Sequence, residues 1–344
     1  MLGRSQALRE LPSRRQLGLA ALALAAPLVL AVAVAAFLSE RAQSPQVSAL
    51  VFPARLVQHL KAPVAGGQAS ASAWEQPSAM AVLQGRWFVL DTGNNRILEL
   101  DEAGTVRQVL DRTRDERLAL RQPMAIVTDG RNLYVANSGA SQVLVLEPSG
   151  RVVKVLDLEK VDPQDQAPPR PIGLAVTPNG ELLVSDADNH RLLRYGGDAR
   201  LLQAIGSGRR DGGLEGFNTP AGLALDQAGN IYVVDMLNGR VVQLSPEGTF
   251  LRQFGRLGDT AGTFSRPKDV AVDAMGNVYV SDGLLAAVQV FGPQGEYLGL
   301  IGRKDPRDRR SASLFQAPAG LEISEGRLYV VDRFAGLLGF QVQD

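Results

Sequence analysis

Five aspartates and one asparagine recur at matching positions along this 344-residue chain. They are Asp91, Asn137, Asp186, Asp235, Asp282 and Asp332. Carboxylate and amide oxygens are the ligands that calcium takes in proteins, so a ring of them is a candidate metal site. A polar residue that returns once per repeat is also the common cap of a tight turn. We expect these side chains to cap hairpins rather than to hold a metal.

The chain has two histidines and no cysteine, which limits the other chemistry open to it. Without cysteine there is no disulfide, thiolate metal site or thiol nucleophile. His190 stands where Asn95 stands in the first repeat, and His59 lies in a short segment before the repeats. Two histidines at such different places do not rebuild a multi-histidine zinc site, and a Ser-His-Asp mechanism would have to recruit one of these two. We therefore expect no catalytic, cofactor-binding or metal-ligating residue.

A repeat that runs from Trp74 to Asp344 must position these side chains. Each copy opens on a proline, continues with two apolar segments separated by a turn, and carries the Asp or Asn directly after the second segment. The prolines fall 46 to 51 residues apart, at Pro77, Pro123, Pro171, Pro220, Pro267 and Pro318. A period of this length is typical of a radial or solenoid array.

Alternation of apolar residues predicts four short strands in each copy, because the period is two rather than 3.6. Glycine stands before the second strand at Gly130, Gly180, Gly229, Gly276 and Gly326, where a tight hairpin needs a positive φ. A four-stranded antiparallel sheet cannot bury both faces alone. The fold class we expect is therefore all-β, a six-bladed β-propeller of four-stranded antiparallel blades, preceded by one transmembrane helix.

Closure of the ring is visible in the sequence, because the sixth copy stops just after its third strand. Residues 55–60 match the fourth strands at 151–156 and 200–205 in pattern, although they stand before the first copy. We predict that residues 50–60 supply the missing strand of blade six.

Several segments carry a family resemblance, among them Asp91-Thr-Gly-Asn-Asn-Arg-Ile97 and Asp235-Met-Leu-Asn-Gly-Arg-Val241. On these residues the chain resembles the NHL repeat family over roughly residues 50–344. The resemblance implies the propeller fold. It implies no single activity, because members of the family bind proteins, bind RNA or, in the peptidylglycine amidating lyases, use zinc. The copies that begin at Pro123, Pro267 and Pro318 lack the Asn-Arg pair, so their loops are free for another role.

The N-terminal region contains 22 uncharged residues from Leu17 to Leu38. As a helix this run spans about 33 Å, enough to cross the hydrocarbon core. We expect a cytoplasmic tail at 1–16, a transmembrane helix or signal anchor at 17–38, a linker at 39–49 and the NHL-type propeller at 50–344. A cleaved secretory signal is the alternative, and Ser13-Arg-Arg-Gln-Leu17 also resembles a twin-arginine export signal.

Arginines before the apolar run place the N-terminus in the cytoplasm by the positive-inside rule. We expect a single-pass protein of the cell membrane with an extracytoplasmic propeller, which is periplasmic if the source is a Gram-negative bacterium. Its 36 basic and 36 acidic residues balance, so we expect no nucleic-acid partner.

Loops that differ between copies are the expected recognition surface, since loops on a rigid scaffold carry binding. The segment 302–310 is rich in basic residues, whereas 157–165 is rich in acidic ones and belongs to the opposite side of the ring. The candidate partner-binding residues are Arg112, Arg114, Arg117, Arg209, Arg210, Arg303, Lys304, Arg307, Arg309 and Arg310.

These features favour a membrane-anchored protein-interaction or scaffolding module that acts through its loop face and has no cofactor. The partner we expect is a protein of the cell envelope or an acidic envelope ligand. The alternative is a calcium-dependent hydrolase or lyase with its active site in the central funnel. That activity requires non-repeating Asp, Glu or Asn side chains at the axis, and the sequence shows no obvious cluster of them.

Overall fold

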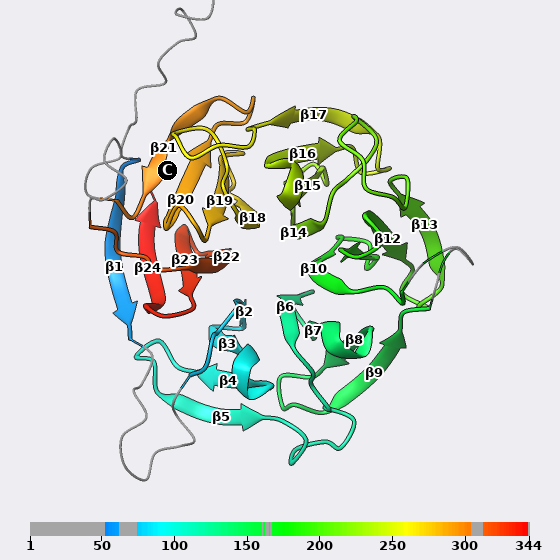
Figure 1. Cartoon of the computed structure of the whole chain (residues 1–344). Helices are drawn as coiled ribbons and strands as arrows, with labels where there is room; N and C mark the ends of the chain where they lie inside the picture. Colours follow the sequence, from blue (N-terminus) through cyan, green and yellow to red (C-terminus); the bar gives the residue numbers. More distant parts are fainter. Residues whose placement is uncertain are drawn as a thin grey trace, which may run out of the picture. The chain divides into compact units, whose positions relative to one another are not determined.

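The computed structural model describes residues 52–61, 74–159, 161, 165, 167–303 and 312–342. They form six four-stranded antiparallel sheets around one axis (Figure 1), within a unit that spans Ala49–Asp344. The expected all-β six-bladed propeller is therefore confirmed. The predicted tail, membrane span and linker lie outside the described residues. No helix among the described residues is long and apolar enough to cross a membrane.

Blades one to three follow one another in sequence, and each runs from its innermost to its outermost strand. Blade one comprises β2 (Ala79–Leu83), β3 (Arg86–Asp91), η1 (Thr92–Asn94), β4 (Arg96–Leu100) and β5 (Val106–Leu110). Blade two comprises β6 (Pro123–Thr128), β7 (Leu133–Asn137), η2 (Ser138–Ala140), β8 (Gln142–Leu146) and β9 (Val152–Asp157). Blade three comprises β10 (Pro171–Val176), β11 (Leu182–Asp186), β12 (Arg191–Tyr195) and β13 (Leu201–Ile205).

Blades four to six repeat this order, except that the last takes its outer strand from the start of the chain. Blade four comprises β14 (Pro220–Leu225), β15 (Ile231–Asp235), η3 (Met236–Asn238), β16 (Arg240–Leu244) and β17 (Phe250–Phe254). Blade five comprises β18 (Pro267–Val272), β19 (Val278–Asp282), β20 (Ala287–Phe291) and β21 (Tyr297–Ile301). Blade six comprises β22 (Pro318–Ser324), β23 (Arg327–Asp332), β24 (Gly336–Val342) and β1 (Ala54–Leu60).

Strand β1 closes the ring, as the sequence predicts. It pairs antiparallel with β24, in a register that begins at Ala54 opposite Val342 and ends at Leu60 opposite Leu337. His59 lies on this strand, and its Nε2 is 3.0 Å from the carbonyl oxygen of Ala335. Figure 1 shows the first and last described strands side by side at the rim.

Each repeating Asp or Asn fastens a hairpin to the connection that enters its blade. All six side chains are fully buried. Their oxygens accept hydrogen bonds of 2.6 to 3.0 Å from the backbone N–H groups of Glu75, Arg121, Arg170, Asn218, Ser265 and Gln316. Asp282 and Asp332 also accept from backbone N–H groups of their own hairpins, so the expected cap is confirmed in blades five and six. In blades one, two and four the side chains of Asp91, Asn137 and Asp235 form no cap hydrogen bond to the hairpin backbone, and they bind side chains of the hairpin instead.

The Asn-Arg pair of the repeat completes this fastening in three blades. Arg96, Arg191 and Arg240 donate from Nε to the aspartate of their own hairpin, at 2.7, 3.2 and 2.7 Å. His190 behaves as a substitute for Asn95, because its Nδ1 accepts from the N–H of Thr219 at 3.0 Å, as Asn95 Oδ1 accepts from the N–H of Gln122. Both residues adopt positive φ. His190 is therefore part of the fold.

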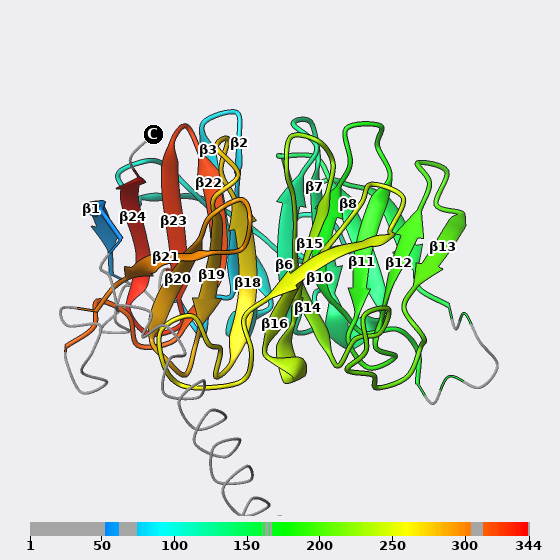
Figure 2. The same cartoon turned by 90° about the horizontal axis from the view of Figure 1, so that it is seen from above.

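The antiparallel order of the strands sorts the loops onto two faces (Figure 2). The hairpins between second and third strands share one face with the connections from each fourth strand to the next blade. We call this the hairpin face. The hairpins between first and second strands lie on the other face, and their glycines adopt the expected positive φ, for example 83° at Gly130 and 81° at Gly229.

Candidate functional site

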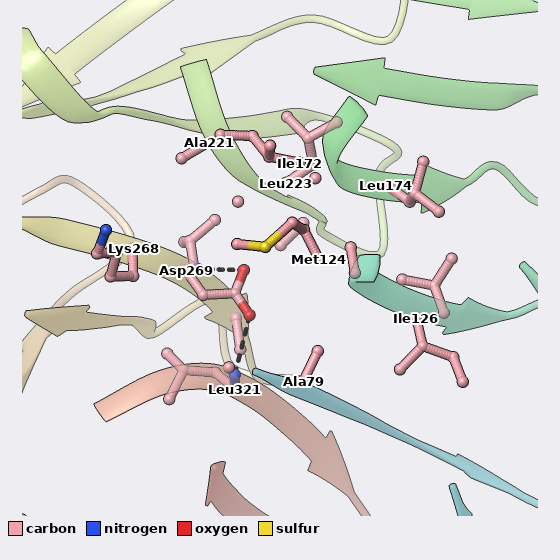
Figure 3. A pocket seen from close by; sticks show the side chains of 18 of the residues that line it. Ala79, Met124, Ile126, Ile172, Leu174, Ala221, Leu223, Lys268, Asp269 and Leu321 are labelled. Carbon is pink, nitrogen blue, oxygen red and sulfur yellow. Dashed lines mark hydrogen bonds between the residues drawn. The ribbon is translucent and has the colours of Figure 1, made fainter. Parts of the chain in front are cut away.

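The innermost strands of all six blades line a central channel that encloses about 550 Å³. Its wall combines apolar side chains with polar and charged groups, and Ile126, Leu174, Leu223 and Leu321 are among the buried side chains that Figure 3 draws around it. A cavity of this size and lining is in the range that binds small organic molecules. The channel is therefore the first candidate site.

Four cationic side chains line the channel where it opens on the hairpin face, and we call them the basic mouth: Arg170, Arg266, Lys268 and Arg333. Three of them flank paired strand ends at this end of their blades. Arg170 and Arg266 directly precede Pro171 and Pro267, and Arg333 directly follows Asp332. Arg170 pairs with Asp188 at 2.8 Å. Among the described residues, no carboxylate forms an ion pair with the other three.

The pKa of Lys268 is lowered at the basic mouth. Partial burial is the main cause that lowers its pKa to about 8, and the neighbouring guanidinium groups of Arg266 and Arg333 lower it further. Its Nζ lies 3.7 Å from Sδ of Met236. An anion bound at the basic mouth would offset this repulsion and raise the pKa of Lys268 again.

Two carboxyl groups lie deeper in the channel. Asp269 points into the cavity (Figure 3), where its oxygens accept from the N–H groups of Val270 at 3.0 Å and Leu321 at 2.9 Å. Glu322 accepts from the N–H of Val82 at 3.4 Å. Water in the channel reaches part of both side chains, but protein surrounds them, and this burial raises the pKa of Asp269 to about 7 and that of Glu322 to about 8.

Glycine makes room for Asp269 in the neighbouring blade. A Cβ atom added to Gly222 would lie 2.2 Å from Oδ1 of Asp269, which is far inside contact distance. The packing of blade four against blade five is thus fitted to a carboxyl group at this position. Near neutral pH the channel presents carboxyl groups that can hold a proton and either donate or accept a hydrogen bond.

The Asp269→Asn variant is expected to lose part of the pH dependence of stability. Because the folded pKa of Asp269 is raised, its contribution to the unfolding free energy is present below about pH 4 and is lost as the pH rises through about 7. The asparagine does not titrate, so the variant gains a few kcal/mol relative to the parent at pH 8, at about 1.4 kcal/mol per pKa unit. Urea unfolding from pH 4 to pH 9 measures this.

Glu322→Gln is the matched comparison for that series, because its carboxyl has the higher pKa. It should flatten the same curve at higher pH than Asp269→Asn does. If both variants follow the parent curve in parallel, neither carboxyl titrates differently in the folded chain.

Sequence reasoning missed this channel chemistry, because it found no obvious cluster of non-repeating acids, whereas two such acids line the channel. Asp269 and Glu322 are non-repeating acids on inner strands, as Lys268 is a non-repeating base. The available signal was the pair of positions after each opening proline. In the copy that opens at Pro267 these positions hold Lys268 and Asp269, whereas the other copies have small or apolar residues there.

The structure distributes the sequence-predicted loop residues around the hairpin face without gathering them. Arg112, Arg114 and Arg117 are exposed in the connection from β5 to β6, where Arg117 pairs with Asp115 at 2.7 Å. Arg209 and Arg210 are exposed between β13 and β14. These are separate gaps between blades, so the two groups do not form one site.

The remaining predicted residues belong to the connection from β21 to β22. Arg303 donates from Nη2 to the carbonyl oxygen of Leu285, which gives it a role in holding the loop. Lys304, Arg307, Arg309 and Arg310 lie outside the described residues. On the opposite side of the ring, Asp165 of the acidic segment forms a buried pair with Arg191 at 2.6 Å, so part of that acidity is neutralised within the fold.

Neither a histidine site nor a carboxylate cluster for a metal is found in the part of the chain that the structure describes. His59 and His190 each serve the fold, and no group of three or more His, Asp or Glu side chains there could hold a metal ion. Among the described residues, the calcium alternative has Asp269 and Glu322 as candidate ligands in the channel.

Fold and sequence together define the class of protein. The chain is a six-bladed β-propeller with an NHL repeat, since the family model of the NHL repeat matches residues 169–195, in blade three. This confirms the resemblance on the copy that carries Asp186 and His190. No curated protein is a significant sequence match to the chain.

Solved structures share the architecture at low sequence identity. A gluconolactonase from Xanthomonas campestris is 16% identical with a TM-score of 0.60, and the match covers 86% of this chain and 99% of that one. Virginiamycin B lyase from Staphylococcus aureus is 11% identical, with a TM-score of 0.57 and coverage of 83% and 99%. A luciferin-regenerating enzyme is 12% identical, with a TM-score of 0.57 and coverage of 85% and 95%. At such identities the likeness establishes the fold alone.

Proposed function

We propose that this protein is a membrane-anchored, extracytoplasmic binding module that recognises an acidic group at the basic mouth of its channel. The partner is a protein of the cell envelope or an acidic envelope ligand. The observation that carries the proposal is a set of three cations, Arg266, Lys268 and Arg333, that form no ion pair with a described carboxylate and lie at one opening of the channel. Like charges held together by a fold are costly unless an anion neutralises them.

The hairpin face around the mouth supports this function. Arg209 and Arg210 are exposed on it, as are Arg112 and Arg114 farther round the ring. Such a distribution speeds encounter with an acidic partner and orients it, while the mouth supplies the close contacts. The uncharged run at 17–38 would hold the module on the membrane.

Charge reversal tests the proposal. We expect residues 49–344 to bind a fluorescein-labelled oligoglutamate peptide, and the double variant Lys268→Glu, Arg333→Glu to bind it at least about tenfold more weakly, because two close cations become anions. Fluorescence anisotropy at low and at physiological salt measures the affinity. Cross-linking and co-purification of the full chain from its native membranes, with the same variant alongside, then recovers the natural partner.

Arg131→Glu with Arg327→Glu is the control, since both arginines are exposed at hairpins of the opposite face and the change in net charge is identical. Equal losses in the two double variants would mean that net charge alone attracts the peptide. Undiminished binding in the mouth variant would rule out the mouth as the site, and Arg209→Glu with Arg210→Glu would then test the loops.

A hydrolase or lyase that acts in the channel is the second candidate function, and Asp269 and Glu322 favour it. Paired carboxyl groups with raised pKa values in a cavity are candidates for general acid and base catalysis. The solved structures of this fold named above are described as enzymes. Calorimetric titration with calcium separates a metal-dependent version from the binding module: a heat that Asp269→Asn abolishes favours the enzyme.

A further inference from the structure

Large apolar side chains gather on half of the hairpin face. Six of them are 45% to 64% exposed, and we call them the apolar arc: Leu214, Leu237, Leu257, Leu284, Leu314 and Phe334. Three belong to the hairpins between second and third strands of blades four, five and six. The other three belong to the connections that enter these same blades, so the arc follows three consecutive blades on one face.

The repeat does not require these residues. Leu237, Leu284 and Phe334 each stand two positions after the repeating aspartate of their own copy. The corresponding residues of blades one to three are Gly93, Gly139 and Asp188. Half of the ring therefore carries large apolar tips where the other half carries none.

The backbone holds these tips in place while their side chains face solvent. The N–H of Leu237 donates to the carbonyl oxygen of Asn218 at 3.0 Å. The N–H groups of Leu284 and Phe334 donate to the carboxylates of Asp282 and Asp332, at 3.1 and 2.9 Å. The exposed apolar groups are thus presented on fastened hairpins, and 48% to 64% of each of these three side chains is exposed in the described part of the chain.

Basic residues surround the apolar arc. The connections that carry Leu214, Leu257 and Leu314 also carry Arg209, Arg210, Arg256 and Arg303, and the basic mouth lies on the inner side. Their acidic neighbours in the described part of these connections are fewer, namely Asp211, Glu215 and Asp259. Segment 304–310, which lies outside the described residues, has four basic and two acidic residues in the sequence. An excess of positive charge therefore accompanies the exposed apolar side chains.

We propose that the apolar arc docks on the surface of an anionic lipid bilayer, with its leucine and phenylalanine side chains in the interfacial region and the arginines against lipid phosphates. Apolar tips combined with basic residues suit this interface, where apolar burial and attraction to anionic lipid act together. The tips belong to separate hairpins and connections along an arc. A fluid bilayer accepts them without shape complementarity.

This docking goes beyond the proposed function and does not depend on it. It orients the hairpin face, and with it the channel opening, toward the bilayer. The uncharged run at 17–38 of the same chain is expected to keep the propeller near a membrane, which raises the effective concentration of lipid at the arc.

Vesicle flotation tests the proposal with residues 49–344, which contain all six blades and the closing strand but not the apolar run. We expect binding to phosphatidylcholine vesicles that contain phosphatidylglycerol, little binding to phosphatidylcholine alone, and weakening with salt. The triple variant Leu237→Ser, Leu284→Ser, Phe334→Ser should reduce the partition coefficient at least about tenfold, because each tip adds its own interfacial burial.

The matched control removes exposed apolar surface at the rim, by Val153→Ser, Leu202→Ser and Leu251→Ser in β9, β13 and β17. It should bind vesicles as the parent does. The proposal is overturned if the parent does not float with anionic vesicles, or if the tip variant binds as well as the rim variant. Sedimentation without vesicles tests whether the arc instead binds a second copy of the chain. A parent protein that is dimeric, with a tip variant that is monomeric, would assign the arc to that dimer.

Discussion

The Asp235→Ala variant is expected to lose about 3–5 kcal/mol of unfolding free energy, the range seen when one partner of a buried ion pair is removed. Asp235 is fully buried and accepts from the N–H of Asn218, from Asn238 Nδ2 and from Arg240 Nε, all within 2.6 to 2.7 Å. Alanine leaves the Arg240 guanidinium buried without its carboxylate. Urea unfolding monitored by tryptophan fluorescence and circular dichroism measures the loss.

Asp235→Asn should cost less than Asp235→Ala, because an amide keeps the acceptor oxygen for the N–H of Asn218. Blade two already has an amide at this position. Asn137 accepts from the N–H of Arg121 at 2.6 Å, and Gln142 stands where blade four has Arg240. Burial also raises the pKa of Asp235, so neutralising it removes a desolvation cost. If alanine and asparagine cost the same, the acceptor is not what fastens the hairpin.

Removal of β1 is the second change with a large expected effect. A chain that starts at residue 62 leaves blade six with three strands and exposes the edge of β24. Each backbone hydrogen bond contributes about 1 kcal/mol net, so the loss of this strand lowers the unfolding free energy by several kcal/mol. The exposed edge should also promote association between chains. Urea midpoints and size-exclusion profiles against residues 49–344 measure both effects.

A synthetic peptide of residues 52–61 provides the rescue for this truncation. If β1 closes the ring by pairing with β24, the peptide should bind the truncated chain and restore its midpoint. A peptide of the same composition in scrambled order should not. A truncated chain that is already as stable as residues 49–344 would show that closure by β1 contributes nothing.

The fold could be predicted from the sequence because each blade repeats the same residue pattern. Proline opens the inner strand, glycine turns the first hairpin and aspartate caps the second, so blade number and strand order follow from counting. The closing strand was predictable for the same reason, since Arg55 to Leu60 keeps the pattern of a fourth strand and the sixth copy lacks one.

The channel was not predictable by the same reasoning. Arg170, Lys268, Asp269 and Glu322 come from three different copies and meet only because six inner strands converge on one axis. Their effect on each other depends on burial, which no spacing in the sequence expresses. The loop arginines mislead for the opposite reason: a charge run is easy to see, yet Arg117 and Arg303 are engaged within the chain and the groups lie in separate gaps.

Closure by the first strand has a consequence for biosynthesis. Residues 54–60 emerge from the ribosome long before their partner at 336–342, so β1 has no strand to pair with until the last blade is made. A strand that must wait is a hazard if its side chains are apolar. β1 combines Arg55, Gln58 and His59 with the apolar Leu56 and Val57, and both apolar side chains stay exposed even in the finished ring. The nascent chain therefore carries an unpaired, partly apolar strand until its last blade is made.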